Sequence, residues 1–275
     1  MPELPEVETV RRGLESLIIG KTIISVEVRC PKLIKNVDVS EFESVLLNQT
    51  FRKIRRFGKY LYLDLDDYTI VSHLRMEGKY NYYDEYTHPT KHDHIIFNFS
   101  DESILMYNDT RQFGTLELVK NEDEASLKGI AKLGYEPFDQ EMTSDYLYNK
   151  AKRRTITIKQ FLLDQSIIVG LGNIYADEVL FSVKIHPETK VNKLKKKDFE
   201  HIIEASKNVL TKAIMLGGTT VHSFLSVGNL SGKFQNQLQV YGRAKQPCVV
   251  CQTPIEKIKV GGRGTHFCPN CQKKL

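Results

Sequence analysis

Two closely spaced cysteine pairs near the end of the chain constrain its fold more than any other feature. Cys248 and Cys251 form one pair, Cys268 and Cys271 form the other, and sixteen residues separate them. This spacing is typical of a four-cysteine zinc ribbon, in which each pair occupies a tight turn and a two-stranded hairpin fills the gap. Four thiolates complete a tetrahedral site, so the one expected Zn²⁺ is structural. Two disulfides are the alternative, which a reducing compartment disfavours.

Charge is distributed unevenly along the 275 residues. Residues 1–150 contain 19 Lys and Arg against 26 Asp and Glu, whereas residues 151–275 contain 20 against 8. The basic half favours a polyanionic partner, because Lys and Arg release counterions from nucleic-acid phosphates. Two unrelated solvated faces would produce the same division. Within the acidic half, residues 52–59 hold five basic side chains and no carboxylate.

Composition limits the class of protein. Hydrophobic residues make up 41% of the chain and charged residues 27%, which is ordinary for a globular protein and excludes a disordered one. No apolar run approaches the roughly 20 residues of a membrane helix. The acidic N-terminal region lacks the features of a signal peptide. We therefore expect a cytoplasmic protein that does not associate with a membrane.

Hydrophobic periodicity predicts strands in the first half of the chain. Apolar residues at helical spacing predict one helix over residues 7–18, ended by Gly20. Beyond it the period changes to two: alternate residues of 61–65 share one face, as do those of 95–99. Short strands separated by turn signals predict an antiparallel sandwich or barrel.

The second half of the chain is predicted to be helical before the cysteines. One apolar stripe begins at Ile158, and a second helix is expected to start at Asn173, whose side chain suits an N-cap. A third helix is expected over 196–216, where Gly217 and Gly218 stop it.

The amino terminus offers a reactive group. Removal of Met1 would expose the secondary amine of Pro2, and an α-amino group holds roughly several hundred times more free base at pH 7 than a lysine. Condensation with a sugar carbon would give a cationic iminium that favours elimination. Glu3 could act as the general acid. The alternative is that Pro2 and Pro5 merely begin a helix.

Several short motifs together resemble bacterial formamidopyrimidine-DNA glycosylases. They occur in that family's order, span nearly the whole chain, and precede the four-cysteine ribbon. The motifs are residues 2–9 (PELPEVET), 57–61 (FGKYL), 73–78 (HLRMEG), 109–114 (DTRQFG), 170–176 (GLGNIYA) and 240–243 (VYGR).

The resemblance implies an α+β fold in three parts. These are an N-terminal catalytic β-sandwich flanked by helices (1–135), a helix-two-turns-helix domain (136–225) and a zinc-finger hairpin (226–275). It implies a monomeric bacterial enzyme of base excision repair, a glycosylase and abasic-site lyase. Such an enzyme excises 8-oxoguanine and formamidopyrimidines from damaged double-stranded DNA through an N-terminal proline Schiff base, then cuts the strand by β,δ-elimination.

Matching motif positions imply the catalytic roles. Pro2 resembles the nucleophile that attacks the sugar C1′, and Glu3 the acid that assists cleavage. Glu6 resembles a supporting carboxylate. Lys59 resembles the lysine implicated in recognition and elimination.

The resemblance also implies DNA contacts. Met76, Arg111 and Phe113 match residues that fill the space left by an extruded base, and their chemistry suits that task. Lys59, His73, Asn173 and Arg263 match phosphate contacts. Gln112 departs from the basic residue of many relatives, and residues 224–232 correspond to a variable loop that closes over the base.

Two alternative functions remain open at this point. An endonuclease VIII-like glycosylase would prefer oxidised pyrimidines, although the PELP start and the Arg111-x-Phe113 motif argue against it. A zinc-ribbon protein that binds damaged DNA without cutting it belongs to a different class. Borohydride reduction on abasic DNA separates them, because only an enzyme forms a reducible covalent intermediate.

Overall fold

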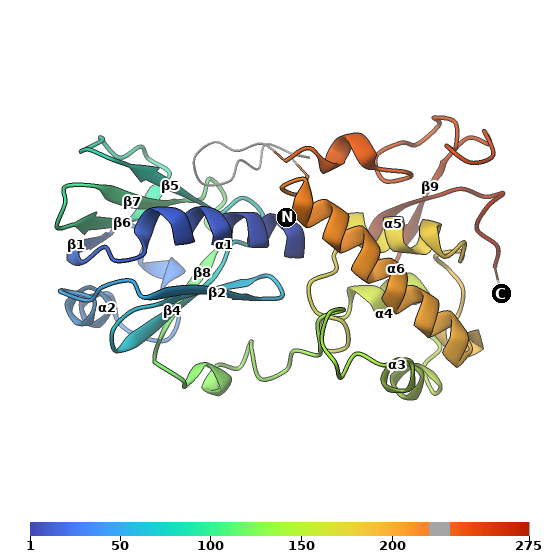
Figure 1. The fold of residues 1–275 in the computed structure, drawn as a ribbon, viewed down its shortest axis with the longest axis horizontal. Helices are drawn as coiled ribbons and strands as arrows, with labels where there is room; N and C mark the ends of the chain where they lie inside the picture. Colours follow the sequence, from blue (N-terminus) through green and yellow to red (C-terminus); the bar gives the residue numbers. More distant parts are fainter. Residues whose placement is uncertain (220–231, 275) are drawn as a thin grey trace. The chain divides into compact units, whose positions relative to one another are not determined.

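The protein divides into two compact units in the computed structural model, which describes residues 1–219 and 232–274. One unit comprises residues 1–131 with 217–232, and the other comprises 132–216 with 233–275. Figure 1 shows the strands of the two four-stranded sheets in the first unit and most of the helices in the second.

Two four-stranded antiparallel sheets form the first unit. One has the order β1-β6-β7-β5 and the other β2-β3-β4-β8. The strands of the first sheet are β1 (Ile23–Val28), β5 (Lys79–Tyr83), β6 (Asp93–Phe99) and β7 (Ile104–Asn108). Those of the second are β2 (Lys53–Phe57), β3 (Tyr60–Asp64), β4 (Tyr68–His73) and β8 (Thr115–Lys120).

One hydrophobic core joins both sheets to the first helix. Helix α1 (Leu4–Ile18) lies against β2 and β3 (Figure 1), and its Val7, Val10 and Leu14 are buried. Alternate residues of the strands, such as Leu61 and Phe97, point into the same core. Helix α2 (Val39–Val45) packs against β1. The predicted helix and antiparallel sandwich are both confirmed.

Helices dominate the second unit. They are α3 (Ser144–Ala151), α4 (Ile158–Leu163), α5 (Asn173–Ser182) and α6 (Lys196–Met215). Helix α6 contacts both α3 and α5, and the predicted helix over 196–216 is confirmed (Figure 1). Short 3₁₀ turns occupy Pro31–Leu33, Glu124–Ser126, Val191–Lys193 and Phe234–Gln237.

The predicted N-cap of α5 is wrong by one residue. Gly172 is the N-cap, in an extended conformation, and Asn173 is the first helical residue. The Asn173 side chain does not cap its own helix, because its Nδ2 donates to the Gly264 carbonyl oxygen at 2.9 Å. A contact distant in sequence therefore replaces the local one.

The predicted hairpin between the cysteine pairs is present. Strands β9 (Glu256–Val260) and β10 (Arg263–Phe267) pair antiparallel, with Val260 opposite Arg263. The two-residue turn uses Gly261 and Gly262, both at positive φ (54° and 79°), a conformation that glycine adopts without strain.

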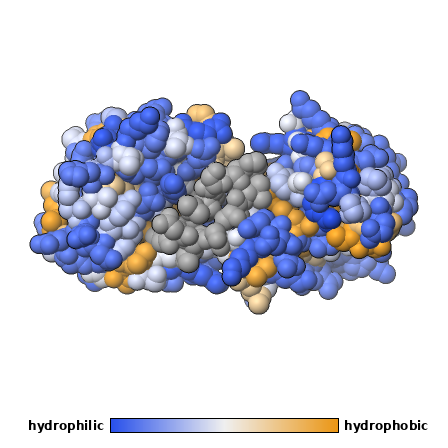
Figure 2. Space-filling view, turned by 90° about the horizontal axis from the view of Figure 1, so that it is seen from above, coloured by the Kyte–Doolittle hydropathy of each residue, from blue (hydrophilic) through white to orange (hydrophobic). Residues whose placement is uncertain are grey.

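The surface is mostly hydrophilic on the face seen in Figure 2, with separate apolar patches. Within residues 1–219 and 232–274, no helix has both the length and the apolar character needed to cross a bilayer.

Candidate functional site

The amino-terminal segment is buried at the start of α1. Pro2 is buried, and only 2% of Glu3 and 3% of Glu6 are exposed. Glu3 and Glu6 form a reciprocal capping box, in which the Glu3 N–H donates to Glu6 Oε2 at 2.9 Å. The local reason is the acidic residue three positions after the cap, which satisfies an otherwise unpaired donor. The terminus is thereby fixed in place.

Glu6 also holds a distant segment of the same unit. Its Oε1 accepts hydrogen bonds from the Thr219 N–H at 2.7 Å and the Thr219 hydroxyl at 3.1 Å. Gly218, at φ +75°, lies so close that a Cβ there would come within 2.7 Å of Glu6 Oε1. The Glu6 carboxylate therefore links the start of α1 to Thr219. The predicted loop 224–232 lies, apart from Gly232, outside the described residues.

Several charges surround the terminal amine. Burial lowers the pKa of the Met1 amino group, and Lys59 acts in the same direction. Glu3, Glu6 and Glu77 oppose this shift. Lys59 lies on the turn between β2 and β3, directly after Gly58 at φ +57°, and is 6% exposed. Glu3, Glu6 and Lys59 therefore all act electrostatically on the terminal amine.

His73 is a neutral hydrogen-bond donor. Its Nδ1 accepts the Arg75 N–H at 3.0 Å, so the proton resides on Nε2. Burial lowers the pKa of His73 to about 3, and the positive charges of Arg75 and Lys59 add to this effect. A neutral imidazole with a free Nε2–H can donate to a phosphate oxygen.

The three residues predicted to fill the vacated space are exposed. Met76 is 38% exposed and Phe113 is 53% exposed, although both are large and apolar. The Arg111 guanidinium lies 4.7 Å from the centre of the Phe113 ring. A hydrogen bond from the Thr110 hydroxyl to Glu77 joins the loop of Met76 to the loop of Arg111 and Phe113.

A buried aspartate that sequence reasoning left without a role organises this second loop. Asp109 is fully buried and accepts hydrogen bonds from three backbone N–H groups, those of Arg111, Phe113 and Gly114. Its only signal in the sequence is its place as the first residue of the motif at 109–114 (DTRQFG).

The basic cluster at residues 52–59 is largely neutralised by neighbouring carboxylates. Its ion pairs are Arg52 with Asp66 (2.6 Å), Arg55 with Asp64 (2.5 Å) and with Glu124, and Arg56 with Glu8 (3.1 Å). The density of basic residues in the sequence therefore overstates the positive potential of this strand.

In the second unit, Asn173 and the hairpin are locked together. Asn173 Nδ2 donates to Gly264, the residue after Arg263, and Asn173 Oδ1 is buried with no hydrogen-bond partner among residues 1–219 and 232–274. The Arg263 side chain lies at the start of β10 and is exposed. The structure thus brings Asn173 and the residue beside Arg263 into direct contact.

A buried ion pair beneath this contact was not predicted. Lys159 and Asp177 are both fully buried, with Nζ 2.5 Å from Oδ1. Lys159 also donates to the Asn173 carbonyl oxygen at 2.9 Å, and Asp177 accepts the His266 N–H at 2.8 Å. Helices α4 and α5 are therefore tied to β10.

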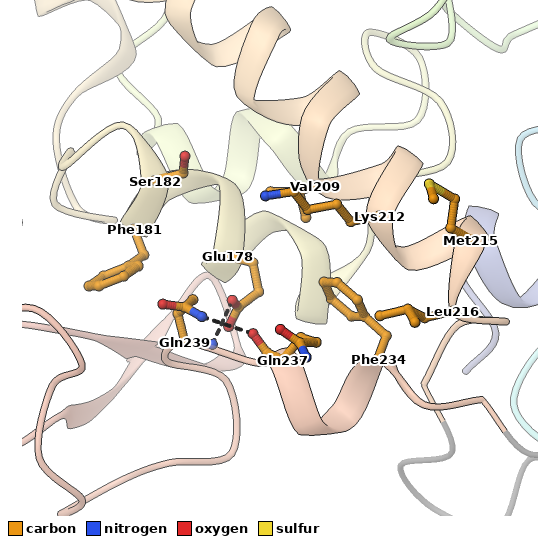
Figure 3. Close-up of a pocket in the computed structure, with 10 residues that line it drawn as sticks. All are labelled: Glu178, Phe181, Ser182, Val209, Lys212, Met215, Leu216, Phe234, Gln237 and Gln239. Atoms are coloured by element: carbon orange, nitrogen blue, oxygen red, sulfur yellow. Dashed lines mark hydrogen bonds between the residues drawn. The ribbon is translucent and has the colours of Figure 1, made fainter.

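The neighbouring Glu178 anchors the segment that leads to the cysteines. Its carboxylate accepts the N–H groups of Gln239, Val240 and Tyr241 at 2.8, 3.0 and 2.9 Å, and Figure 3 shows the bond to Gln239. Burial raises the pKa of Glu178, while these three donors act in the opposite direction. Figure 3 shows Glu178 in a pocket of about 620 Å³ that Phe181, Met215 and Phe234 also line.

The four predicted ligand cysteines converge on one point. Their sulfur atoms all lie within 4.8 Å of one another, with Cys248 and Cys271 at 3.9 Å and Cys251 and Cys268 at 3.4 Å. A tetrahedral zinc with bonds of about 2.3 Å needs sulfur separations of roughly 3.8 Å. These distances are too long for a disulfide, and all four cysteines are free. The cluster fits a metal ion.

A β-sandwich unit and a helical unit that ends in a four-cysteine finger define a zinc-finger protein of mixed α and β architecture. Three family profiles match it in order. Residues 1–116 match the formamidopyrimidine-DNA glycosylase N-terminal domain, 133–225 its H2TH domain, and 245–274 a zinc finger found in FPG and IleRS. The chain belongs to the formamidopyrimidine-DNA glycosylase family, as its motifs predicted.

Individual relatives agree over the full length. The chain is 48% identical over 273 residues to the formamidopyrimidine-DNA glycosylase of Listeria monocytogenes, covering 99% of this chain and 100% of that protein. It is 43% identical, with a TM-score of 0.92, to wild-type Lactococcus lactis Fpg in complex with DNA containing N7-benzyl-Fapy-dG. With the complex of the Lactococcus lactis Fpg and abasic-site DNA, the sequence identity is 42% and the TM-score is 0.92. Both comparisons cover 99% of this chain and 100% of the other chain. The predicted fold class is confirmed.

Proposed function

We propose that this chain excises oxidised purines, 8-oxoguanine and formamidopyrimidines, from duplex DNA and then cuts the strand at the abasic sugar. The position of the chain's start carries the proposal, because Pro2, Glu3 and Glu6 are all buried at the beginning of α1. Glu3, Glu6 and Lys59 supply acidic and basic groups around it. Family membership over the whole chain supports the same activity.

The first chemical step would use Pro2 after removal of Met1. The Pro2 nitrogen forms a bond to the sugar C1′, and the bond from C1′ to the base breaks. The base leaves with the bonding electrons and takes up a proton, which balances the proton that the Pro2 nitrogen loses after it bonds to C1′. Glu3 protonates the ring oxygen as the sugar opens, which leaves a cationic iminium between Pro2 and C1′.

The iminium then drives strand cutting. It acidifies C2′, and loss of a proton there breaks the C3′–O bond. Loss of a second proton, from C4′, breaks the C5′–O bond, and both phosphates leave with the bonding electrons. Lys59 would assist recognition and these later steps from its position near the amine.

DNA binding would divide between the two units. Lys59 and His73 of the first unit, with Asn173 and Arg263 of the second, would contact phosphates. Asn173 suits this role because it is the first residue of α5, where the positive end of the helix dipole favours an anion. Met76, Arg111 and Phe113 would fill the space left by the extruded base, and their exposure supports this role.

The four cysteines would hold one structural Zn²⁺. Thiolates at this spacing suit zinc and leave no open coordination position, so the ion would stabilise the finger and take no part in the chemistry. The hairpin that carries Arg263 lies between the two pairs and would depend on the ion for its position.

Borohydride trapping on abasic DNA tests the proposal. The wild-type protein should become covalently linked to the DNA, and Pro2→Gly should keep DNA affinity but lose most trapping and strand cutting. Pro5→Ala is the matched control, because Pro5 lies three residues further on, in the first turn of α1, and does not bear the amine. Intact mass reports whether Met1 has been removed. Equal cutting by Pro2→Gly would eliminate the nucleophile, and DNA binding without any trapping would indicate a non-catalytic binding protein.

A further inference from the structure

We propose that Asp109 is a positioning residue, whose buried carboxylate fixes the loop that presents Arg111 and Phe113 to DNA. The inference rests on the proposed function, because it concerns how these two side chains reach the space left by an extruded base. Asp109 itself would touch neither the base nor the sugar.

The side-chain carboxylate of Asp109 accepts hydrogen bonds from this loop alone. Oδ1 accepts the Arg111 N–H at 3.0 Å, and Oδ2 accepts the Phe113 and Gly114 N–H groups at 2.9 and 2.8 Å. Within the described part of the chain, these three backbone groups are the carboxylate's only hydrogen-bond partners. A buried carboxylate is costly unless it is paired, so three convergent donors are needed to keep it there.

The loop lacks any apolar anchor of its own. Thr110 and Arg111 are exposed, and more than half of Phe113 is exposed, with the Arg111 guanidinium against its ring. Gln112 adopts φ +53°, an unfavourable conformation for a side chain with a Cβ. Its backbone N–H donates to the Asp109 carbonyl oxygen at 3.2 Å. Order in this loop therefore depends on Asp109, on the backbone around it and on the hydrogen bond from the Thr110 hydroxyl to Glu77.

The surrounding structure fixes Asp109 in turn. Its N–H donates to the His92 carbonyl oxygen at 3.0 Å, and its carbonyl oxygen lies 2.9 Å from His94 Nε2. At Gly114, an added Cβ would lie 1.7 Å from the Tyr107 hydroxyl, so the end of the loop is packed tightly against β7. A rigid strand end thus holds the aspartate, and the aspartate holds an otherwise exposed loop.

Asp109→Asn is the primary test. An amide has only one acceptor oxygen, so at least one of the three N–H groups loses its partner. Asp93→Asn is the matched control. Asp93 is also buried in the sandwich and accepts three hydrogen bonds, from the Thr90 N–H, the Thr90 hydroxyl and Asn108, but it holds no residue proposed to contact DNA.

The readout is the rate of borohydride trapping on abasic DNA, measured on a duplex and on the corresponding single strand. Only the duplex contains an orphaned base and a space to fill. Asp109→Asn should slow duplex trapping by about tenfold or more, the loss expected for a charge-assisted hydrogen bond. Single-strand trapping should change by less than about threefold, and Asp93→Asn should leave both rates within that range.

A double-mutant cycle separates positioning from general stability. If Asp109 acts through Phe113, Asp109→Asn should add little to the duplex defect of Phe113→Ala. A defect that is fully additive, or one that is equal on duplex and single strand, would overturn the proposal. So would wild-type duplex trapping by Asp109→Asn. If the wild-type protein is not trapped on either DNA, the proposed function itself is refuted.

Two substitutions of Gln112 test the proposal if Asp109→Asn does not fold. Proline cannot adopt the positive φ of Gln112, whereas glycine can. Gln112→Pro should reproduce the duplex-specific loss and Gln112→Gly should not. Equal duplex rates for these two variants would contradict the dependence on loop conformation.

Discussion

Replacing Lys159 with methionine should destabilise the second unit far more than replacing an exposed lysine. Lys159 is fully buried, and its ammonium contacts Asp177 at 2.5 Å and the Asn173 carbonyl oxygen at 2.9 Å. Methionine has a similar length but no charge or donor. The Asp177 carboxylate would then remain buried, with the His266 N–H among its remaining partners.

The magnitude follows from the burial of both partners. Removal of one member of a buried ion pair costs about 3–5 kcal/mol, because the other charge remains out of water. For a unit of this size, that loss corresponds to a decrease in Tm of roughly 10–15 °C. Lys196 provides the control, since it pairs with Asp145 while the two side chains are 56% and 64% exposed. Lys196→Met should leave the Tm nearly unchanged, because an exposed ion pair is screened by water.

Thermal unfolding of the zinc-loaded protein, followed by far-ultraviolet circular dichroism, measures both variants. The helical signal reports mainly on the second unit, which contains α3 to α6. The double variant Lys159→Met/Asp177→Leu should recover part of the loss, because it removes the isolated charge. A Tm for Lys159→Met within about 2 °C of that for Lys196→Met would refute the reasoning.

Three further predictions concern pH, metal and salt. Burial lowers the pKa of His73 to about 3 from an unfolded value of 6.5, so the unfolded chain binds more protons between these values. The free energy of unfolding should therefore fall as pH drops from about 6.5 towards 3, and urea titrations of His73→Gln should show a shallower fall. Cys251→Ser should release zinc to a chelator and weaken DNA binding measured by fluorescence anisotropy; unchanged affinity would limit the ion to local stability. Of the four proposed phosphate contacts only Lys59 and Arg263 are charged, so log K against log salt should have a slope of about −1.8, reduced by about 0.9 in Arg263→Ala, whereas a slope near zero would contradict the proposed contacts.

The sequence predicted those parts of the fold that local patterns determine. Alternation in residues 61–65 identified one strand face, and the helical spacing of Val7, Val10 and Leu14 identified α1, since each pattern has a period that matches one backbone geometry. The cysteine spacing predicted both the metal cluster and its hairpin, because four ligands of one ion must converge.

Contacts between distant residues could not be predicted in this way. Asn173 was expected to cap α5, yet its side chain bonds to Gly264, ninety-one positions further along the chain. Residues 52–59 hold five basic side chains and no carboxylate, but carboxylates from three other segments (8, 64–66 and 124) pair with their arginines. Neither the periodicity nor the composition of a segment specifies which distant groups will face it.

Three of the residues missed by sequence reasoning share one physical role. Asp109, Asp177 and Glu178 are buried carboxylates whose oxygens accept backbone N–H groups of a loop or hairpin. Each lies close to residues proposed to contact DNA or to the finger that carries them. An exposed side chain that is proposed to contact DNA cannot also pack in the core to fix its own backbone. A buried residue nearby has to fix that backbone instead. A carboxylate can accept hydrogen bonds from several N–H groups at once and in a fixed geometry. An apolar side chain cannot accept hydrogen bonds from backbone N–H groups that are turned away from water. The residues proposed to contact DNA are therefore recognisable in the sequence as motifs, while the buried acids proposed to position them become visible only when the chain is folded.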